Sequence, residues 1–277
     1  MRRAAVLVAV LAFLPASTAS AVGPWLGVAD GAPGIASTTE SVSFVATVQG
    51  AGTTVAARDE SGAVVSRATV PGKWGIPLVT FRGDAGGLSE NGRVLVLAQP
   101  YGGNGGLRPS TSFAVMRTKP LALRTTVRLR GDFGFDALSA DGRTLYLIQH
   151  VSEKNLFSYR VRAYDLRAGK LLAGVIADKR QASWLMNGMP VARATSPDGR
   201  WVYTLYSGSD NYPFVHALDT ATRTAVCIGL PWDWSTQADS IQGAGLSLAG
   251  GTLKVVGGGL QPDRFALDTR TFAVTAL

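Results

Sequence analysis

The chain has 277 residues, and its 27 lysines and arginines against 19 aspartates and glutamates give a formal net charge of +8. Hydrophobic residues make up 46% of the chain and charged residues only 17%, the opposite of the composition that keeps a chain disordered. The single cysteine excludes a disulfide scaffold and every multi-cysteine zinc or iron–sulfur site. With two histidines and no Gly-x-x-x-x-Gly-Lys phosphate loop, we expect neither a bound metal nor a cofactor.

Residues 1–21 have the features of a secretory signal peptide. A positive start at Arg2 and Arg3 is followed by an apolar run over residues 4–14 and by small residues that end at Ala21. We therefore predict cleavage after Ala21. An uncleaved anchor is the alternative, although the apolar run is shorter than the roughly 20 residues that span a bilayer.

The remaining residues, 22–277, are predicted to form one domain that is secreted or otherwise extracytoplasmic. No further apolar segment is long enough to cross a membrane, so we expect no stable membrane insertion after cleavage. The positive charge is spread along the sequence without a run of five or six Lys or Arg, and we expect no nucleic-acid partner. We expect a monomer whose partner is a protein or a glycan at the cell envelope.

A turn motif recurs before strand-like apolar runs. Asn-Gly and Asp-Gly between two such runs are typical of a hairpin, because the turn requires positive φ. The glycines are separated by 50, 57 and 51 residues. The four copies are Ser89-Glu90-Asn91-Gly92, Ser139-Ala140-Asp141-Gly142, Ser196-Pro197-Asp198-Gly199 and Ser247-Leu248-Ala249-Gly250.

A second marker has the same period: a strand-like run that ends in Asp and is followed by a polar turn. Asp at the start of a turn can accept a hydrogen bond from its own backbone two residues on. The marker positions are Asp59, Asp165, Asp219 and Asp268, with a degenerate copy at Arg117.

Five markers predict five repeats of about 51 residues, each with four short strands. In the third repeat we place the strands at 135–139, 144–149, 158–165 and 170–177. Four antiparallel strands repeated radially describe an all-β fold, a β-propeller of five blades. The first blade, roughly 24–73, lacks the turn motif. A β-sandwich or barrel with accidental similarity is the alternative.

The Ser-Pro-Asp-Gly-Arg turn at 196–200, followed by Trp-Val-Tyr, resembles the WD-repeat-like blades of bacterial TolB-type and YncE-type propellers. The resemblance covers residues 85–277. It implies a propeller fold, although members of these families often have six or seven blades, and the closing Trp-Asp dipeptide of eukaryotic WD blades is absent from the matching strand end.

Propeller topology sorts the loops onto two faces. Second-to-third loops and blade-to-blade connections emerge on one side, which we call the connection face; the Asn-Gly and Asp-Gly turns lie on the opposite turn face. Loops on a rigid scaffold often carry binding residues. We therefore predict a ligand site on the connection face, whose aromatic and amide residues are Trp74, Tyr101, Asn104, Phe133, Trp184, Asn187, Tyr212, Trp232 and Trp234. The alternative for each aromatic residue is core packing between blades.

The sequence favours a non-catalytic binding or scaffold module for a glycan, peptide or protein. No Gly-x-Ser-x-Gly elbow and no Cys–His pair is evident. His150 and His216 are interpreted as structural. The alternative is a glycan-cleaving hydrolase, which needs two carboxyl groups at the channel mouth. The acids that could reach it are Asp84, Asp132, Asp136, Asp210, Asp233 and Asp239.

Overall fold

The computed structural model describes residues 26–101, 106–181, 185–208, 212–232, 241–257 and 263–277. Within these residues the chain forms six antiparallel sheets and a single 3-10 turn, η1 (Ile241–Gly243). None of the helical structure in these ranges is long and apolar enough to cross a bilayer. The described chain is therefore almost entirely β, as the sequence predicts.

Five of the sheets follow one another along the chain, and we number them in that order. Sheet 1 contains β2 (Ile35–Ala36), β3 (Val42–Gln49), β4 (Gly52–Asp59) and β5 (Val64–Pro71). Sheet 2 contains β7 (Val94–Ala98), β8 (Ser110–Thr118) and β9 (Leu121–Arg130). Sheet 3 contains β10 (Phe133–Leu138), β11 (Thr144–His150), β12 (Ser158–Asp165), β13 (Lys170–Leu171) and β14 (Met186–Asn187). Sheet 4 contains β15 (Pro190–Thr195), β16 (Trp201–Tyr206), β17 (Phe214–Asp219) and β18 (Thr224–Gly229). Sheet 5 contains β19 (Gly245–Ala249), β20 (Thr252–Val256), β21 (Phe265–Asp268) and β22 (Val274–Ala276). The sixth sheet pairs β1 (Val28–Ala29) with β6 (Ile76–Pro77).

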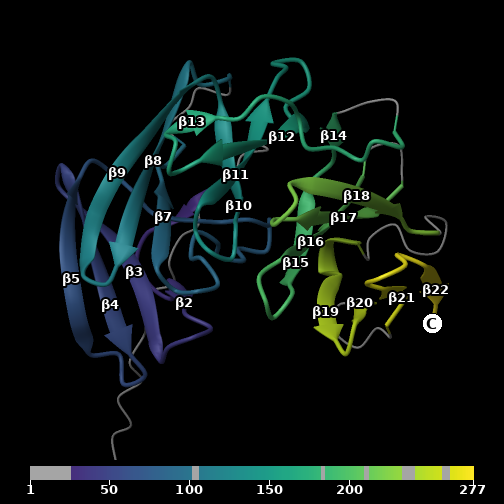
Figure 1. The fold of residues 1–277 in the computed structure, drawn as a ribbon, viewed down its shortest axis with the longest axis horizontal. Coiled ribbons are helices and arrows are strands. Elements are labelled where there is room, and N and C mark those ends of the chain that lie inside the picture. The colour runs from purple at the N-terminus through teal and green to yellow at the C-terminus, as the bar shows by residue number, and fades with distance from the viewer. Residues whose placement is uncertain (1–25, 102–105, 182–184, 209–211, 233–240, 258–262) are drawn as a thin grey trace, which may run out of the picture.

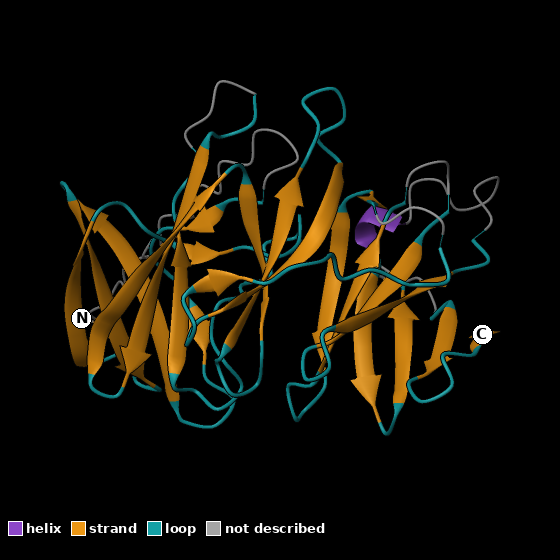
Figure 2. Cartoon of the chain, turned by 45° about the horizontal axis from the view of Figure 1, so that its top comes forward, coloured by secondary structure: helices purple, strands orange, loops and turns teal. Residues whose placement is uncertain are grey.

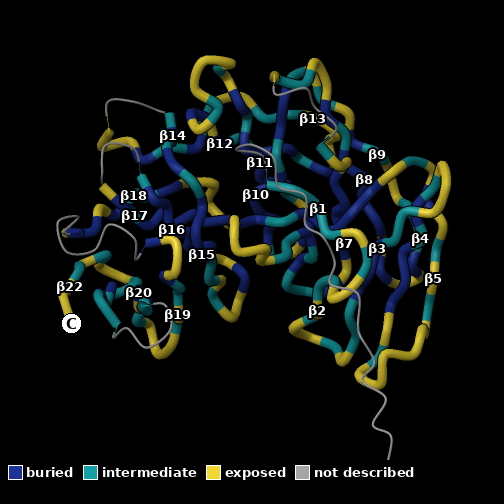
Figure 3. Tube along the Cα trace, turned by 180° about the vertical axis from the view of Figure 1, so that it is seen from behind, coloured by how far each residue is buried: buried dark blue, intermediate teal, exposed yellow. Residues whose placement is uncertain are grey.

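The five numbered sheets lie side by side around an arc, with their first strands toward the centre and their last strands outermost (Figure 1). Figure 2 shows the hairpin turns and connections at the two ends of the strands. Buried residues concentrate between the sheets, whereas the outer strands β5 and β22 are largely exposed (Figure 3).

Apolar side chains fill each space between consecutive sheets, because a single sheet cannot shield its own two faces from water and a neighbouring sheet must cover them. Separate core clusters join sheet 1 to sheet 2, sheet 2 to sheet 3, sheet 3 to sheet 4, and sheet 4 to sheet 5. Among the described residues, no core cluster joins sheet 5 to sheet 1.

The segment between β6 and β7 connects distant parts of the arc by hydrogen bonds. The Phe81 backbone N–H donates to the carbonyl of Pro190 in sheet 4 at 3.0 Å. The Arg82 guanidinium donates to the carbonyls of Gly243 and Ala244, just before sheet 5, at 3.1 and 2.9 Å. This segment therefore links sheet 2 to the last two sheets.

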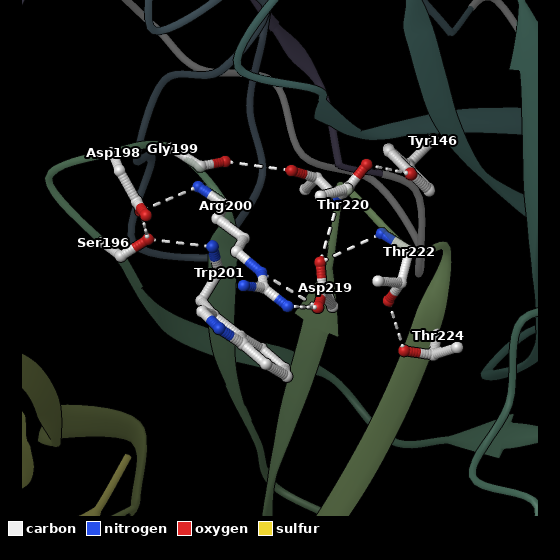
Figure 4. Close-up of polar contacts among 11 residues, drawn as sticks. Tyr146, Ser196, Asp198, Gly199, Arg200, Trp201, Asp219, Thr220, Thr222 and Thr224 are labelled. Carbon is white, nitrogen blue, oxygen red and sulfur yellow. Dashed lines mark hydrogen bonds and ion pairs between the residues drawn. The ribbon is translucent and has the colours of Figure 1, made fainter. Parts of the chain in front are cut away.

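The first repeated turn has one hydrogen-bond pattern in sheets 2, 3 and 4. In sheet 4, the Ser196 hydroxyl is 2.5 Å from the Asp198 carboxylate and accepts the Trp201 N–H at 2.8 Å, while Asp198 accepts the Arg200 N–H at 3.0 Å (Figure 4). The same contacts recur around Ser89 and Asn91 and around Ser139 and Asp141. The motif is therefore a side-chain-braced turn.

The second marker also forms a recurrent turn. In each of four copies the Asp carboxylate accepts two backbone N–H groups from the residues just after it; the copies are Asp59, Asp165, Asp219 and Asp268. In sheet 4, Asp219 also accepts from the Arg200 guanidinium at 2.7 Å, which ties the two turns of that sheet together (Figure 4). The hydroxyl of Tyr146 in sheet 3 donates to the carbonyl of Thr220, the residue after Asp219, at 2.7 Å.

Three local predictions need correction. The fourth turn copy is a two-residue Gly250-Gly251 hairpin, and Ser247 lies inside β19, because Ala249 stands where the other copies have the Asp or Asn that braces a longer turn. The fourth strand of the third repeat ends at Leu171, with an isolated bridge from Val161 to Ile176, because the chain bulges around Gly174, whose φ is +87°. In sheet 2 the innermost strand is reduced to a bridge between Leu88 and Leu95.

Candidate functional site

The connection face carries an apolar pocket between sheets 2 and 3. Its walls come from the β1 and β6 region, the loops after β7 and β11, the start of β10 and the segment before β15. These are second-to-third loops and sheet-to-sheet connections, so residues distant in sequence converge at this site. The aromatic residues that line it are Phe81, Tyr101, Phe113, Phe133, Phe135, Phe157 and Tyr159.

Two of these rings lie at the mouth of the pocket. Phe81 is 37% exposed and Phe157 is 41% exposed, whereas Phe133 and Phe135, which line the same pocket, are buried. Exposed phenylalanine rings that line one pocket can bury their apolar surface against a partner. The mouth can therefore bury apolar surface of a ligand.

The polar end of the pocket is a buried ion pair. Arg108 donates to Asp132 through Nε at 2.8 Å, and its Nη2 also donates to the Phe133 carbonyl at 2.6 Å. Nδ1 of His150 lies 3.7 Å from the same carboxylate. Burial alone raises the pKa of Asp132, but contact with His150 and the charge of Arg108 outweigh it and lower that pKa to about 2. Asp132 is therefore ionised and compensated at neutral pH.

Tyr101 extends this polar end toward solvent. Its hydroxyl donates to the Gly106 carbonyl at 2.6 Å, and the Arg108 guanidinium lies 5.3 Å from the centre of its ring. A cation over an aromatic face is attracted by the ring quadrupole. Arg108 is thus held between Tyr101 and Asp132 at one end of the pocket.

The predicted site residues divide into three groups. Tyr101 and Phe133 meet at the pocket described above, and Asn187 and Tyr212 line a second depression of about 160 Å³ beside Met186 and Cys227. Trp74 and Trp232 are buried in core clusters, where Trp74 Nε1 donates to the Pro71 carbonyl at 2.7 Å and Trp232 packs on Phe265. Asn104, Trp184 and Trp234 lie outside the described residues.

The candidate catalytic acids within the described chain are engaged in structural contacts. Asp136 of β10 forms a buried ion pair with Arg193 of β15 at 2.6 Å, which joins sheets 3 and 4 near the centre of the arc. Asp84 accepts from the Thr80 hydroxyl at 2.8 Å. Asp210, Asp233 and Asp239 lie outside the described residues. An ionised carboxylate held by arginine, such as Asp132, cannot donate a proton as a general acid at neutral pH.

His216 and Cys227 face each other across β17 and β18, with Sγ and Nδ1 3.5 Å apart. Burial lowers the pKa of His216 to about 4 and raises the pKa of Cys227 to about 12. Both groups are therefore neutral near pH 7, and the thiol lacks the thiolate character that nucleophilic chemistry requires.

Antiparallel meanders that succeed one another around an arc, first strand inward, define a β-propeller fold. Solved structures support this class. A functionally unknown protein from Desulfotomaculum acetoxidans DSM 771 is 11% identical, with a TM-score of 0.52 over 91% of this chain and 68% of that one. The periplasmic gluconolactonase PpgL of Pseudomonas aeruginosa is 20% identical, with a TM-score of 0.51 over 87% of this chain and 67% of that one. These identities establish similarity of fold alone. No family model and no curated protein sequence matches the chain.

Sequence reasoning predicted only Tyr101 and Phe133 of the aromatic lining, and the residues it missed include Phe81, Arg108 and Phe157. Phe157 had a detectable signal, because Leu156-Phe157 interrupts an otherwise polar second-to-third loop. Phe81 and Arg108 had none, because their place in the pocket depends on how the β6–β7 segment and the loop after β7 fold back over sheet 2.

Proposed function

We propose that this protein is a non-catalytic binding module, a secreted five-bladed β-propeller of the TolB/YncE-like type that acts as a monomer at the cell envelope. The five-fold marker and the four core clusters between successive sheets support the blade count. The apolar run and small residues of the first 21 positions support export.

The observation that carries the binding role is the connection-face pocket with Phe81 and Phe157 exposed at its mouth. Its lining is mostly apolar, and its arginine, Arg108, is already paired with Asp132. A saccharide needs several unpaired polar groups to orient its hydroxyls, whereas an apolar side chain needs only a complementary apolar wall. We therefore favour a peptide or protein partner that inserts an apolar side chain.

A display library of random peptides panned on the purified full-length protein tests this proposal. We expect enrichment of peptides that share an apolar or aromatic residue, and loss of their binding in Phe157→Asp. Val65→Asp is the matched control, because Val65 is an exposed apolar residue on β5, outside the pocket lining. Absence of enrichment, or equal loss in both variants, would contradict the proposal.

The alternative is hydrolysis of a glycan by channel-mouth carboxylates. A panel of polysaccharides, with an aldonolactone added because one structural neighbour is named as a gluconolactonase, tests it. We expect no turnover. Turnover that Asp132→Asn abolishes, in a variant with the wild-type circular dichroism spectrum, would replace the binding proposal with catalysis.

A further inference from the structure

The turn face carries a groove of about 770 Å³ that crosses sheets 1, 2 and 3. Its lining comes from the β2–β3 turn, from the turns of sheets 2 and 3, and from adjoining positions of β7, β8 and β9. The charged residues that line it are Glu40, Arg93, Arg117, Lys119, Arg124, Asp141, Arg143 and Arg167.

Six cations and two acids give this groove a net charge of +4. Glu40 pairs with Lys119 at 2.7 Å, and Asp141 lies 3.5 Å from Arg143. Within the described part of the chain, the side chains of the four remaining arginines make no hydrogen bond or ion pair: Arg93, Arg117, Arg124 and Arg167. The positive charge that is dispersed in the sequence is therefore gathered in space. Arg167 has the carboxylate of Asp165 near it, whereas Arg93, Arg117 and Arg124 have no carboxylate partner among the described residues.

The internal repeat shows how this charge arises. In sheet 4, Trp201 pairs with Asp219, and Arg200 next to it forms an ion pair with that carboxylate at 2.7 Å. In sheet 2, Val94 pairs with Arg117, so Arg93 stands beside another cation at the matching register.

A third position of the turn changes in the same direction, since Asn91 replaces the acid found at Asp198. The three matching positions carry a net charge of −1 in sheet 4, from Asp198, Arg200 and Asp219. They carry a net charge of +2 in sheet 2, from Asn91, Arg93 and Arg117. Adjacent like charges are destabilising in an isolated sheet. These like charges stand where sheet 4 has an ion pair, and an external anion would supply the missing negative charge.

We propose that this groove binds an acidic polysaccharide through its carboxylate or sulfate groups. Five of the six cations are arginines, whose planar guanidinium forms paired hydrogen bonds with such oxyanions. The lining contains no aromatic ring on which a base could stack, and its one aliphatic side chain, Val94, is buried, so no apolar group is available to enter a lipid surface. This site is separate from the connection-face pocket, so the test of this proposal does not depend on the outcome of the peptide-binding proposal.

Arg117→Asp is the most informative variant, because it restores the acid that the repeat has at this position and leaves the turn otherwise intact. The full-length protein is titrated by calorimetry with heparin, a sulfated chain, and with polygalacturonate, a carboxylated chain. We expect binding of at least one, weakened about tenfold or more by Arg117→Asp and decreasing steeply between about 50 and 200 mM salt. The thermal unfolding midpoint should stay the same or rise, which separates loss of binding from loss of fold.

Arg270→Asp is the matched control, since Arg270 is an exposed arginine on a turn of sheet 5 at the same face and outside the groove. It should leave the affinity nearly unchanged. Equal weakening in both variants would reduce the interaction to net charge and overturn the proposal. So would absence of binding to either polysaccharide, or tighter binding to an oligothymidine or to phosphatidylglycerol vesicles of matched charge.

Discussion

The turn faces of sheets 4 and 2 are built on the same repeat but differ in what neutralises their arginine. In sheet 4, Asp219 is buried, braces its own turn through two backbone N–H groups and pairs with Arg200. In sheet 2, Arg117 takes the position of that acid, remains exposed and leaves Arg93 without a carboxylate. Under the proposal that the groove binds an acidic polysaccharide, the same scaffold position serves internal stability in sheet 4 and an external ligand in sheet 2, because a charge that is satisfied internally is no longer available to a partner.

The largest expected effect is in sheet 4. Asp219→Ala removes the carboxylate that accepts two N–H groups and the Arg200 guanidinium, and its side chain is only 3% exposed. We expect a loss of about 3 kcal/mol in the free energy of unfolding, because three hydrogen bonds to a charged acceptor are lost, each contributing about 1 kcal/mol. Urea denaturation measures this loss.

The matching substitution in sheet 2, Arg117→Ala, should change the free energy of unfolding by less than about 0.5 kcal/mol. Similar losses in Asp219→Ala and Arg117→Ala would contradict the view that this position stabilises sheet 4 but not sheet 2.

Acidification should weaken sheet 4 more than sheet 2. His216 of β17 is buried, and burial lowers its pKa from the ordinary 6.5 to about 4; in sheet 2 the matching residue is Ala114. The unfolded chain takes up a proton as the pH falls through 6.5, and the folded chain does not until about pH 4. The contribution of neutral His216 to the free energy of unfolding is therefore fully present above pH 6.5. It decreases below that pH, by about 2 kcal/mol at pH 4.5.

Urea denaturation at pH 7 and pH 4.5 measures this pH dependence. His216→Met should flatten it, since the thioether carries no titrating group. An unchanged pH dependence in that variant would assign the effect to other residues.

The braced turn itself should contribute a smaller amount, similar in the two sheets. Ser196→Ala and Ser89→Ala each remove a hydroxyl that accepts the backbone N–H of the first residue of the next strand, Trp201 of β16 and Val94 of β7. We expect about 1 kcal/mol for each. Thermal unfolding of the two variants checks this, and a loss confined to sheet 4 would show that the turns differ in more than charge.

The smallest expected effect is a gain. Arg117→Asp places a carboxylate beside Arg93, as Asp219 stands beside Arg200, and should raise the free energy of unfolding by up to about 1 kcal/mol, the range of an exposed ion pair. A double-mutant cycle with Arg93→Ser isolates the coupling. A coupling energy of zero would mean that the two side chains do not meet.

The sequence determined the sheet architecture because its signals are local. Period-2 strands, the Ser-x-Asp-Gly turn and the Asp that braces the next turn act within a few residues, so the hairpins around Asp141, Asp198 and Asp219 could be predicted from spacing alone. The sorting of loops onto two faces followed from the antiparallel meander. The shortened β13 and the interrupted inner strand of sheet 2 could not be predicted, because bulges and insertions depend on packing against neighbouring sheets.

Only the tertiary structure decided which candidate residues face solvent and which charges gather. Trp74 and Trp232 look like Tyr212 in the sequence, yet the first two fill the space between sheets and Tyr212 is 72% exposed. The arginines of the turn-face groove come from turns as far apart as Arg93 and Arg167, and no run of basic residues marks them. Their convergence follows from the angle at which successive sheets pack, a long-range property that turn and strand patterns do not encode.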